Sequence, residues 1–254
     1  MAYLDPLELA RETAAVVCRG EARKYYRFRA ARFYGGIATA DCVGCNLRCL
    51  FCWAWEVTTR PQEVGEFLSP RQAAERLVQI ARRKGLRQVR VSGNEPTLAR
   101  EHLLALLKSL PADLLFILET NGILIGADPT YAAELARTPN LYVRVSLKGA
   151  SEADFARLTL ADPQGFGLQL AALRHLTEAG VDCFPAVMTS FSSAEDLAAL
   201  RRRLAEIRPD LAAFEPEEVV LYGEVAARLQ RAGLSLGNTS GRAHDPRRVP
   251  PEQV

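Results

Sequence analysis

The sequence predicts an α/β fold, in which parallel strands with helices outside them form a partial (β/α)6 barrel. From residue 33 onward, extended and helical patterns alternate about five times, and a sixth strand fits residues 211–221. Such alternation is typical of parallel strands joined by right-handed crossovers. The alternating pattern is too short for an eightfold barrel, so six strands are expected.

Strands are expected where short runs of apolar and β-branched residues occur. The first run, 33–41, leads directly into a cysteine-rich loop. Residues 87–93 are rich in β-branched side chains, and the run at 114–120, LLFILET, is apolar enough for a buried strand. Two more strands are expected at 141–149 and 181–191.

Helices are expected between these strands, and some carry clear boundary signals. The expected helices are 69–85, 99–110, a segment near 129–137, 164–179 and 193–207. In the first of them Ser69 is placed as the N-cap, Pro70 follows at the first helical position, and Gly85 ends the helix. Ser, Pro and Gly are preferred at these three positions for their capping oxygen, fixed φ and tolerance of positive φ.

The two ends of the chain differ in composition from this pattern. Residues 19–32 carry six basic side chains against one acidic side chain, interleaved with Tyr25, Tyr26 and Phe28. We expect an extension, residues 1–32, whose aromatic side chains pack on the core; a patch for nucleic acid is the alternative. Residues 33–236 form the barrel, and the polar, Gly- and Pro-rich residues 237–254 are expected to be a disordered tail.

Composition limits the class of protein. The formal net charge is +2, and 48% of residues are hydrophobic, so whole-protein electrostatics indicate no partner. No stretch approaches the roughly 18–20 uninterrupted apolar residues of a membrane-spanning helix. The first 17 residues lack the basic and then apolar pattern of a secretory signal, so we expect the cytoplasm, where thiols stay reduced.

Four of the six cysteines lie within eleven positions: Cys42, Cys45, Cys49 and Cys52. Structural zinc sites usually separate their two C-x2-C pairs by a dozen or more residues, whereas only three residues separate Cys45 from Cys49. Thiolates this close together suit an iron–sulfur cluster, whose irons can be reached from one loop. If Cys45, Cys49 and Cys52 bind a four-iron cluster, one iron is left free for another ligand.

The stretch CNLRCLFC at 45–52 resembles the cluster-binding motif of the radical S-adenosylmethionine (SAM) superfamily. GNEPTL at 93–98 is similar to the GGEP stretch of this family. ETNG at 119–122 and SLKG at 146–149 resemble the pyruvate formate-lyase activating enzyme branch. The resemblance covers roughly residues 33–190, and all four motifs follow predicted strands, where ligands of open α/β sheets and barrels bind.

The resemblance implies two cofactors, a [4Fe–4S] cluster on Cys45, Cys49 and Cys52 and a SAM molecule on its open iron. It also implies SAM contacts from these residues: Phe51, Gly93, Asn94, Glu95, Pro96, Glu119, Thr120, Ser146 and Lys148. Phe51 would lie against the adenine, while Gly93–Pro96, including the Glu95 side chain, would face the methionyl ammonium. Asn94 stands where the family usually has a second glycine, and it can adopt a left-handed conformation.

For several of these residues a purely structural role is also open. Phe51 would then pack in its loop, Glu119 and Thr120 would cap a strand end, and Ser146 and Lys148 would terminate a strand. Of Trp53 and Trp55, one could line the substrate side or shield the cluster from solvent, and core packing is at least as good an explanation for both.

The remaining cysteines and histidines are interpreted as structural. We favour a role other than cluster ligand for Cys42, because a fourth protein ligand would close the iron that SAM needs. Cys18 and Cys183 resemble small core hydrophobes. The histidines His102, His175 and His244 form no metal-ligand spacing.

The resemblance implies an oxidoreductase that cleaves SAM reductively and abstracts a hydrogen atom from a substrate. An external one-electron reductant of flavodoxin or ferredoxin type is expected. The size of the chain and its ETNG motif favour an activating enzyme that makes a glycyl radical on a protein. A tRNA-base-modifying radical SAM enzyme is the first alternative, a non-catalytic iron–sulfur carrier is the second, and a small-molecule substrate stays open.

Overall fold

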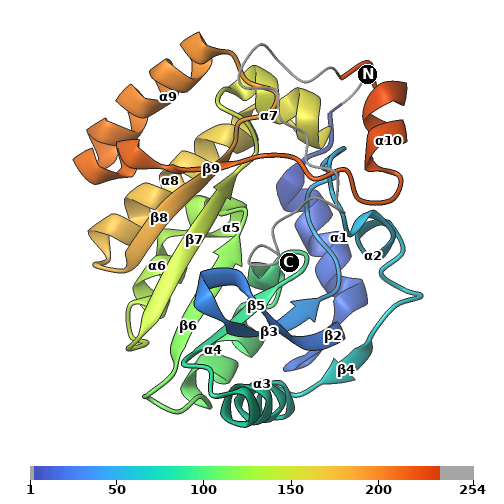
Figure 1. Ribbon diagram of the computed structural model, residues 1–254, viewed down its shortest axis with the longest axis vertical. Coiled ribbons are helices and arrows are strands. Elements are labelled where there is room, and N and C mark those ends of the chain that lie inside the picture. The colour runs from blue at the N-terminus through green and yellow to red at the C-terminus, as the bar shows by residue number, and fades with distance from the viewer. Residues whose placement is uncertain (1–2, 235–254) are drawn as a thin grey trace.

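The computed structural model describes residues 3–234 and confirms the α/β prediction (Figure 1). Its parallel strands are β3 (Ile37–Cys42), β5 (Gln88–Ser92), β6 (Leu115–Thr120), β7 (Leu141–Leu147), β8 (Asp182–Met188) and β9 (Glu215–Glu217). These six strands lie side by side in chain order, each parallel to the next. Their carboxyl ends therefore share one edge of the curved sheet, as a partial (β/α)6 barrel requires.

Helices cover the outer face of this sheet (Figure 1). They are α3 (Pro70–Lys84), α4 (Arg100–Lys108), α5 (Ile123–Ala127), α6 (Pro129–Leu135), α7 (Glu152–Thr159), α8 (Gln164–Glu178) and α9 (Ala194–Ile207). The hydrophobic core lies between these helices and alternate strand residues, with Leu77, Leu106, Val143 and Leu173 among its fully buried members. The concave face of the sheet therefore carries the remaining strand residues.

The boundary signals of the first long helix are confirmed. The Ser69 hydroxyl accepts a hydrogen bond from the Gln72 amide at 3.2 Å, and the Gln72 side chain accepts one from the Ser69 amide at 2.9 Å. This reciprocal pair is a capping box. Gly85 ends the helix with φ at +64°, a conformation that glycine adopts without steric cost.

Two expected strands are shorter than the sequence pattern indicates. Residues 33–41 begin with a 3-10 turn, η1 (Phe33–Gly35), and β3 starts only at Ile37. Gly35 and Gly36 both have positive φ, which prevents the extended strand from beginning earlier. Residues 211–221 contain the end of a second turn, η3 (Pro209–Ala213), and only the three-residue strand β9.

The basic and aromatic segment joins the sheet. After α1 (Pro6–Val17), strand β1 (Cys18–Arg19) pairs with β2 (Ala22–Ala31), which is antiparallel to β3 and also pairs with β4 (Glu66–Leu68). Tyr25 of β2 is 2% exposed and belongs to the core. The division of the chain at residues 32 and 236 stays a prediction, and the expected tail, residues 237–254, lies outside the described residues.

Other helices were not anticipated from the sequence. They are α1, α2 (Trp55–Thr59), α5, α7 and α10 (Val225–Arg231). Within residues 3–234, no helix combines the length and the apolar character needed to cross a membrane. The expected cytoplasmic location stays a prediction.

Candidate functional site

The cysteine-rich loop leaves the carboxyl end of β3 and is held from several sides. The backbone amides of Arg48 and Leu50 donate to the carbonyls of Thr159 (3.1 Å) and Leu158 (2.8 Å) in α7. Within the loop, the Cys52 amide donates to the Cys49 carbonyl at 2.9 Å. The loop therefore has a fixed backbone that depends on a helix more than 100 residues away in sequence.

Cys49 is buried, Cys45 and Cys52 are half-buried, and their thiols affect one another electrostatically. Burial raises the pKa of Cys45 well above its usual range, and the neighbouring Cys49 and Cys52 raise it further. Burial also raises the pKa of Cys49 to about 12, against the opposing effect of Lys148. Thiols that oppose one another's ionisation fit an iron–sulfur cluster, because its positively charged irons favour the thiolate form of their ligands.

Single-ion chemistry fits the loop less well. Nowhere in residues 3–234 do three His, Cys, Asp or Glu side chains come together as the ligands of one metal ion would. In a four-iron cluster each thiolate binds a different iron, so cluster ligands need not converge on one point. The chemistry of the donor set therefore agrees with a cluster better than with zinc.

The remaining cysteines lie apart from this set. Cys42 is fully buried in the hydrophobic core, and burial raises its pKa to about 11. Cys183 is also a core residue, as its sequence context suggested, and Cys18 is half-buried. All six cysteines are free thiols. That Cys42 is no cluster ligand stays a prediction, consistent with its place in the core.

The GNEP loop follows β5 and crosses close to the end of β3. Gly93 has φ at +96°, and a Cβ there would lie 2.8 Å from Asp41 Cβ and 2.9 Å from Asp41 Cα. Only glycine fits both the conformation and the space. Asn94 does not have positive φ and so does not use the left-handed conformation that was open to it: Gly93 makes the turn.

The Asn94 side chain instead ties two loops together. Its Nδ2 donates to the Cys42 carbonyl at 3.0 Å, and its Oδ1 accepts a hydrogen bond from the Thr58 hydroxyl. Thr58 Oγ1 also lies 3.8 Å from Cys52 Sγ. Asn94 thus connects the GNEP loop to Cys42, where the cysteine-rich loop begins, and to Thr58 of α2, the helix that follows this loop. A second glycine has no side chain with which to form these hydrogen bonds.

Glu95 is buried, and its carboxylate is used entirely within the protein. Its Oε1 accepts hydrogen bonds from Thr97 N (3.0 Å), Thr97 Oγ1 (2.6 Å) and Thr120 Oγ1 (2.7 Å). Its Oε2 accepts one from Asn121 N at 2.7 Å. Pro96 begins the buried 3-10 turn η2 (Pro96–Leu98). The side chains of Glu95 and Thr120 therefore join the ends of β5 and β6, and the geometry favours this structural role over a direct contact with SAM.

Asn121 is a site residue that sequence reasoning did not assign. Its Nδ2 donates to Asn46 Oδ1 at 2.7 Å and lies 3.8 Å from Cys45 Sγ. Its carbonyl accepts from Gln169 Nε2 (2.6 Å), which also donates to the Ser146 carbonyl (3.0 Å). The motif ETNG contained Asn121, but its spacing gave no sign of which neighbour the side chain contacts.

The concave face of the sheet carries paired charges. Glu119 accepts hydrogen bonds from Arg90 (2.7 Å), Ser92 (2.7 Å) and the Tyr34 hydroxyl (2.8 Å). Burial alone would raise the pKa of Glu119, but Arg90 and Arg144 hold it below its usual range. On the same face, Asp41 accepts hydrogen bonds from the arginines of β2, Arg27 (2.6 Å) and Arg29 (3.2 Å).

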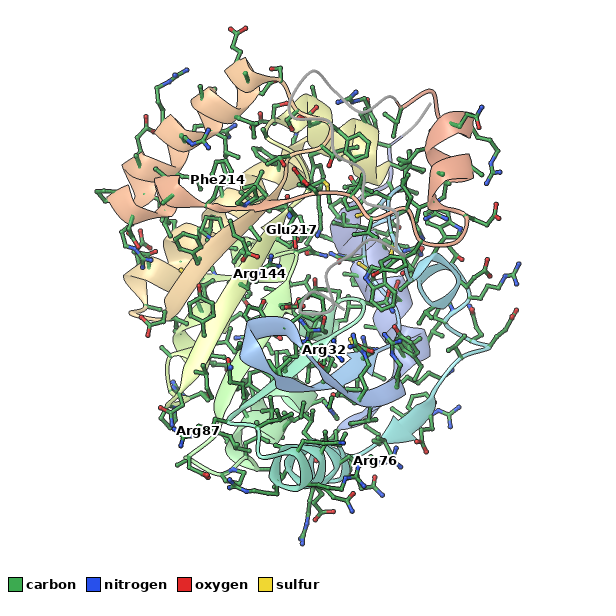
Figure 2. All side chains as sticks on the ribbon, in the orientation of Figure 1. Arg32, Arg76, Arg87, Arg144, Phe214 and Glu217 are labelled. Carbon is green, nitrogen blue, oxygen red and sulfur yellow. The ribbon has the colours of Figure 1, made fainter. Side chains whose placement is uncertain are left out.

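Ser146 and Lys148, the site residues predicted at the end of β7, lie on the concave face of the sheet together with Arg144. Arg144 reaches from β7 across β8 to Glu215 (2.9 Å) and Glu217 (2.8 Å) of β9; Figure 2 labels Arg144 and Glu217 at this place. Ser146 donates to Glu217 at 2.9 Å, and Lys148 Nζ donates to Ser146 Oγ at 2.5 Å. The structure thus brings Lys148 and Ser146 to the same edge as the cysteine-rich loop.

The aromatic side chains of the loop differ in exposure. Phe51 is half-buried and stacks on Phe191, with ring centroids 6.0 Å apart. Trp53 is 47% exposed, so of the alternatives left open for it core packing does not apply. Trp55 packs against an apolar cluster that includes Val225 and Leu229 of α10. Contact of Phe51 with adenine stays a prediction.

The histidines in the described residues are structural. His102 is buried between the Tyr25 hydroxyl (2.8 Å) and the Glu21 carbonyl (2.7 Å). His175 contacts the Ile125 carbonyl at 3.0 Å. His244 lies outside the described residues.

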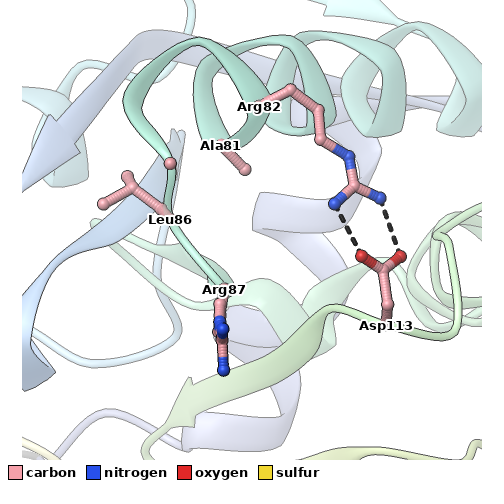
Figure 3. Close-up of a pocket in the computed structure, with 6 residues that line it drawn as sticks. Ala81, Arg82, Leu86, Arg87 and Asp113 are labelled. Atoms are coloured by element: carbon pink, nitrogen blue, oxygen red, sulfur yellow. Dashed lines mark hydrogen bonds and ion pairs between the residues drawn. The ribbon is translucent and has the colours of Figure 1, made fainter.

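Surface pockets lie away from these residues. One pocket is formed by the end of α3 and the segments before β5 and β6, where Arg82 and Asp113 form two hydrogen bonds of 2.6 and 2.7 Å (Figure 3). A second is lined by residues such as Tyr142 and Asp182 near the amino ends of β7 and β8. Both are at the amino edge of the sheet, opposite the cysteine-rich loop, and neither is a candidate active site.

Two curated proteins are similar in sequence to part of this chain. The GTP 3′,8-cyclase of Rhodopseudomonas palustris strain TIE-1 is 32% identical over 121 residues, which make up 45% of this chain and 33% of the cyclase. A probable GTP 3′,8-cyclase of Thermococcus kodakarensis is 34% identical over 125 residues, 46% of this chain and 36% of that protein. The chain therefore spans about a third of the length of these curated relatives.

A solved structure gives the same fold. The crystal structure of Streptococcus suis SuiB bound to S-adenosylmethionine superposes with a TM-score of 0.56 at 21% identity, over 75% of this chain and 44% of SuiB. The family model of the radical SAM superfamily matches residues 41–204, well over half of the chain and the whole stretch from Asp41 to α9. The chain therefore belongs to the radical SAM superfamily.

Proposed function

We propose that this protein is a radical SAM enzyme that binds its cluster through Cys45, Cys49 and Cys52. The radical SAM superfamily uses a [4Fe–4S] cluster and S-adenosylmethionine. With an electron from an external reductant, the bound cluster supplies one-electron cleavage of SAM and, through it, abstraction of a hydrogen atom from a substrate. The observation that carries the proposal is the loop at the carboxyl edge of the parallel sheet that carries Cys45, Cys49 and Cys52, in which the pKa values of Cys45 and Cys49 are raised by burial and by a neighbouring thiol.

The neighbouring strand ends are suited to hold SAM. Lys148 is half-buried at the carboxyl end of β7 and close enough to Cys49 to lower the pKa of its thiol. Its ammonium group can bind the methionyl carboxylate. The backbone of Gly93–Pro96 can face the methionyl ammonium, and Glu95 acts by holding this loop to Thr120 and Asn121. Glu95 is thus proposed as a positioning residue.

The concave face supports a polar substrate. Four arginines and four carboxylates lie on it: Arg27, Arg29, Arg90, Arg144, Asp41, Glu119, Glu215 and Glu217. A barrel interior of this kind differs from the packed branched side chains that fill complete barrels. Paired donors and acceptors suit a substrate that offers both, such as a nucleotide or a peptide backbone.

Three kinds of polar substrate are candidates: a protein, an RNA and a small molecule. Activation of a glycyl-radical protein and modification of a tRNA base remain predictions from sequence resemblance. The curated relatives are named as GTP cyclases, so a purine nucleotide is a third substrate to test. Arg27 and Arg29, which the RNA alternative requires, are held by Asp41, and charge reversal there would disrupt the sheet face as well as RNA binding.

The test is anaerobic reconstitution with iron and sulfide, followed by reduction with SAM and an assay for 5′-deoxyadenosine. Wild type is compared with Cys45→Ala and, as the matched control, Cys42→Ala. We expect cluster and product from wild type and Cys42→Ala, and neither from Cys45→Ala. A well-formed wild-type cluster whose EPR spectrum does not respond to SAM, with no product, would contradict the proposal and favour a non-catalytic iron–sulfur carrier.

A further inference from the structure

A buried arginine from the C-terminal helix contacts the cysteine-rich loop. Arg228 of α10 is 8% exposed, and its guanidinium donates to the carbonyls of Leu50 at 2.7 Å and Cys52 at 2.5 Å. The same group lies over the ring of Trp55, 4.5 Å from its centroid. Figure 1 shows α10 beside α2, which begins directly after the loop. Arg228 thus connects loop residues to a helix 176 residues later in the chain.

This guanidinium forms no ion pair in the part of the chain that the structure describes. No carboxylate in residues 3–234 lies within ion-pair distance of Arg228, whereas Arg27, Arg29, Arg90 and Arg144 are all paired. A buried cation is costly unless opposite charge compensates it. Two carbonyl dipoles satisfy its hydrogen bonds, and the carboxylates that act on its charge, Glu224 and Glu56, do so from beyond ion-pair distance.

Two further cations, Arg48 and Lys148, lie in or beside the loop and also form no ion pair among the described residues. Arg48 donates to the Cys45 carbonyl at 2.8 Å, and Lys148 donates to Ser146 Oγ. Neither lies within ion-pair distance of a carboxylate among the described residues. The loop that carries the three thiols is thus surrounded by cations from three parts of the chain, of which Arg228 is the most buried.

We propose that Arg228 is the counter-charge of the iron–sulfur cluster and raises its reduction potential. The proposal rests on the function proposed above. Three thiolates bring three negative charges to the loop, and reduction adds one electron. A fixed cation beside the loop stabilises the reduced form more than the oxidised form, and the effect is strong where water is excluded. Arg228 therefore acts through its charge, which favours electron transfer from the reductant to the cluster.

Arg228 lies in a C-terminal part of the chain that the radical SAM family model does not cover. The family model ends at residue 204, and α10 begins at Val225. Apolar side chains of α10, Val225 and Leu229, pack with Leu50 in one buried cluster. This packing excludes water from the side of the loop where Arg228 lies and preserves the effect of its charge.

The experiment is an EPR-monitored redox titration of the reconstituted cluster in the full chain, without SAM and without any assay of turnover. The variants are Arg228→Gln, which removes the charge, Arg228→Lys, which keeps it, and Arg231→Gln, which removes an exposed charge from the same helix. At a fixed potential we expect the ratio of reduced to oxidised cluster to fall tenfold or more in Arg228→Gln, or about 59 mV for one electron. Arg228→Lys and Arg231→Gln should stay within twofold of wild type.

A loaded Arg228→Gln cluster with the wild-type potential would overturn the proposal and leave Arg228 as a structural clamp. If Arg228→Gln fails to load, Arg228→Lys decides: loading with the wild-type potential supports a requirement for charge, and failure or a tenfold shift overturns it. Since wild-type 5′-deoxyadenosine formation is measured separately, failure here is distinguishable from failure of the proposed enzyme function.

Discussion

Replacement of Glu95 separates a structural role from a role in binding SAM. In Glu95→Gln the side chain keeps its shape but presents one oxygen and one NH2 group. If the amide oxygen takes the place of Oε1, it still accepts from Thr97 and Thr120, but the NH2 group then faces the Asn121 backbone N–H. Two donors then oppose each other, so at least one buried hydrogen bond is lost in this orientation.

The magnitude follows from the number of donors left without an acceptor. One buried backbone N–H without a partner costs about 1–3 kcal/mol, which we expect for Glu95→Gln. Glu95→Ala leaves the amides of both Thr97 and Asn121 unsatisfied, so a loss of about 2–6 kcal/mol is expected. In the alternate orientation the NH2 group faces the Thr97 backbone N–H, while the hydroxyls of Thr97 and Thr120 can turn to accept from it, so one buried backbone N–H again lacks an acceptor.

The assay is anaerobic unfolding in guanidinium chloride, followed by the fluorescence of Trp53 and Trp55, with SAM affinity measured on the same reconstituted preparations. Glu101→Gln, at an exposed position on α4, is the control and should unfold like wild type. The reasoning is refuted if Glu95→Gln keeps the wild-type free energy of unfolding but loses SAM affinity. That result would mean that the carboxylate contacts SAM directly.

Two other substitutions test the packing near the site. Gly93→Ala should lower the free energy of unfolding by more than about 1–2 kcal/mol, because positive φ is unfavourable with a Cβ and that Cβ would meet Asp41 at 2.8 Å; unchanged denaturant midpoints would contradict this. Burial lowers the pKa of His102 to about 4 from its usual 6.5, so the unfolded chain binds the proton more tightly. Stability present above pH 6.5 should be lost as the pH falls to 4, by about 3 kcal/mol. His102→Gln should flatten this part of the stability profile; a slope equal to that of wild type would assign it to another group.

Local signals were sufficient to predict the barrel and the cysteine-rich loop. Strand and helix patterns alternate along the chain, and helix ends are marked by residues such as Ser69 and Gly85, whose conformations are set by near neighbours. The spacing of Cys45, Cys49 and Cys52 likewise restricts the chemistry within a few residues. These features depend little on distant parts of the chain, so they can be inferred before the fold is known.

Features that depend on distant partners could not be predicted. The direction of the Glu95 side chain follows from Thr120 and Asn121, which are 25 and 26 residues away. Asn94 replaces a glycine of the family and could adopt a left-handed conformation, but its role comes from its side chain, which reaches Cys42 and Thr58. Nothing local marks such a requirement.

In the N-terminal strand β2, too, the positions of side chains depend on a feature that the sequence does not reveal. Basic and aromatic residues of β2 are mixed in sequence, and a register shift between Tyr25 and Arg27 separates them in space. Tyr25 then enters the core while Arg27 and Arg29 face Asp41. A charge pattern that suggested a nucleic-acid surface is, in the fold, in part the edge of a barrel interior.

The distribution of charge links the barrel interior to the cysteine-rich loop. On the concave face each of the arginines Arg27, Arg29, Arg90 and Arg144 has a carboxylate partner, so this face is polar with little excess charge. Around the loop, Arg48, Lys148 and Arg228 bond only to carbonyls or a hydroxyl. Paired charges can accept a substrate without a strong preference for its sign, whereas unpaired cations favour a negative group fixed in place. The two regions therefore meet different needs, one for a polar substrate and the other for a cluster whose negative charge increases on reduction.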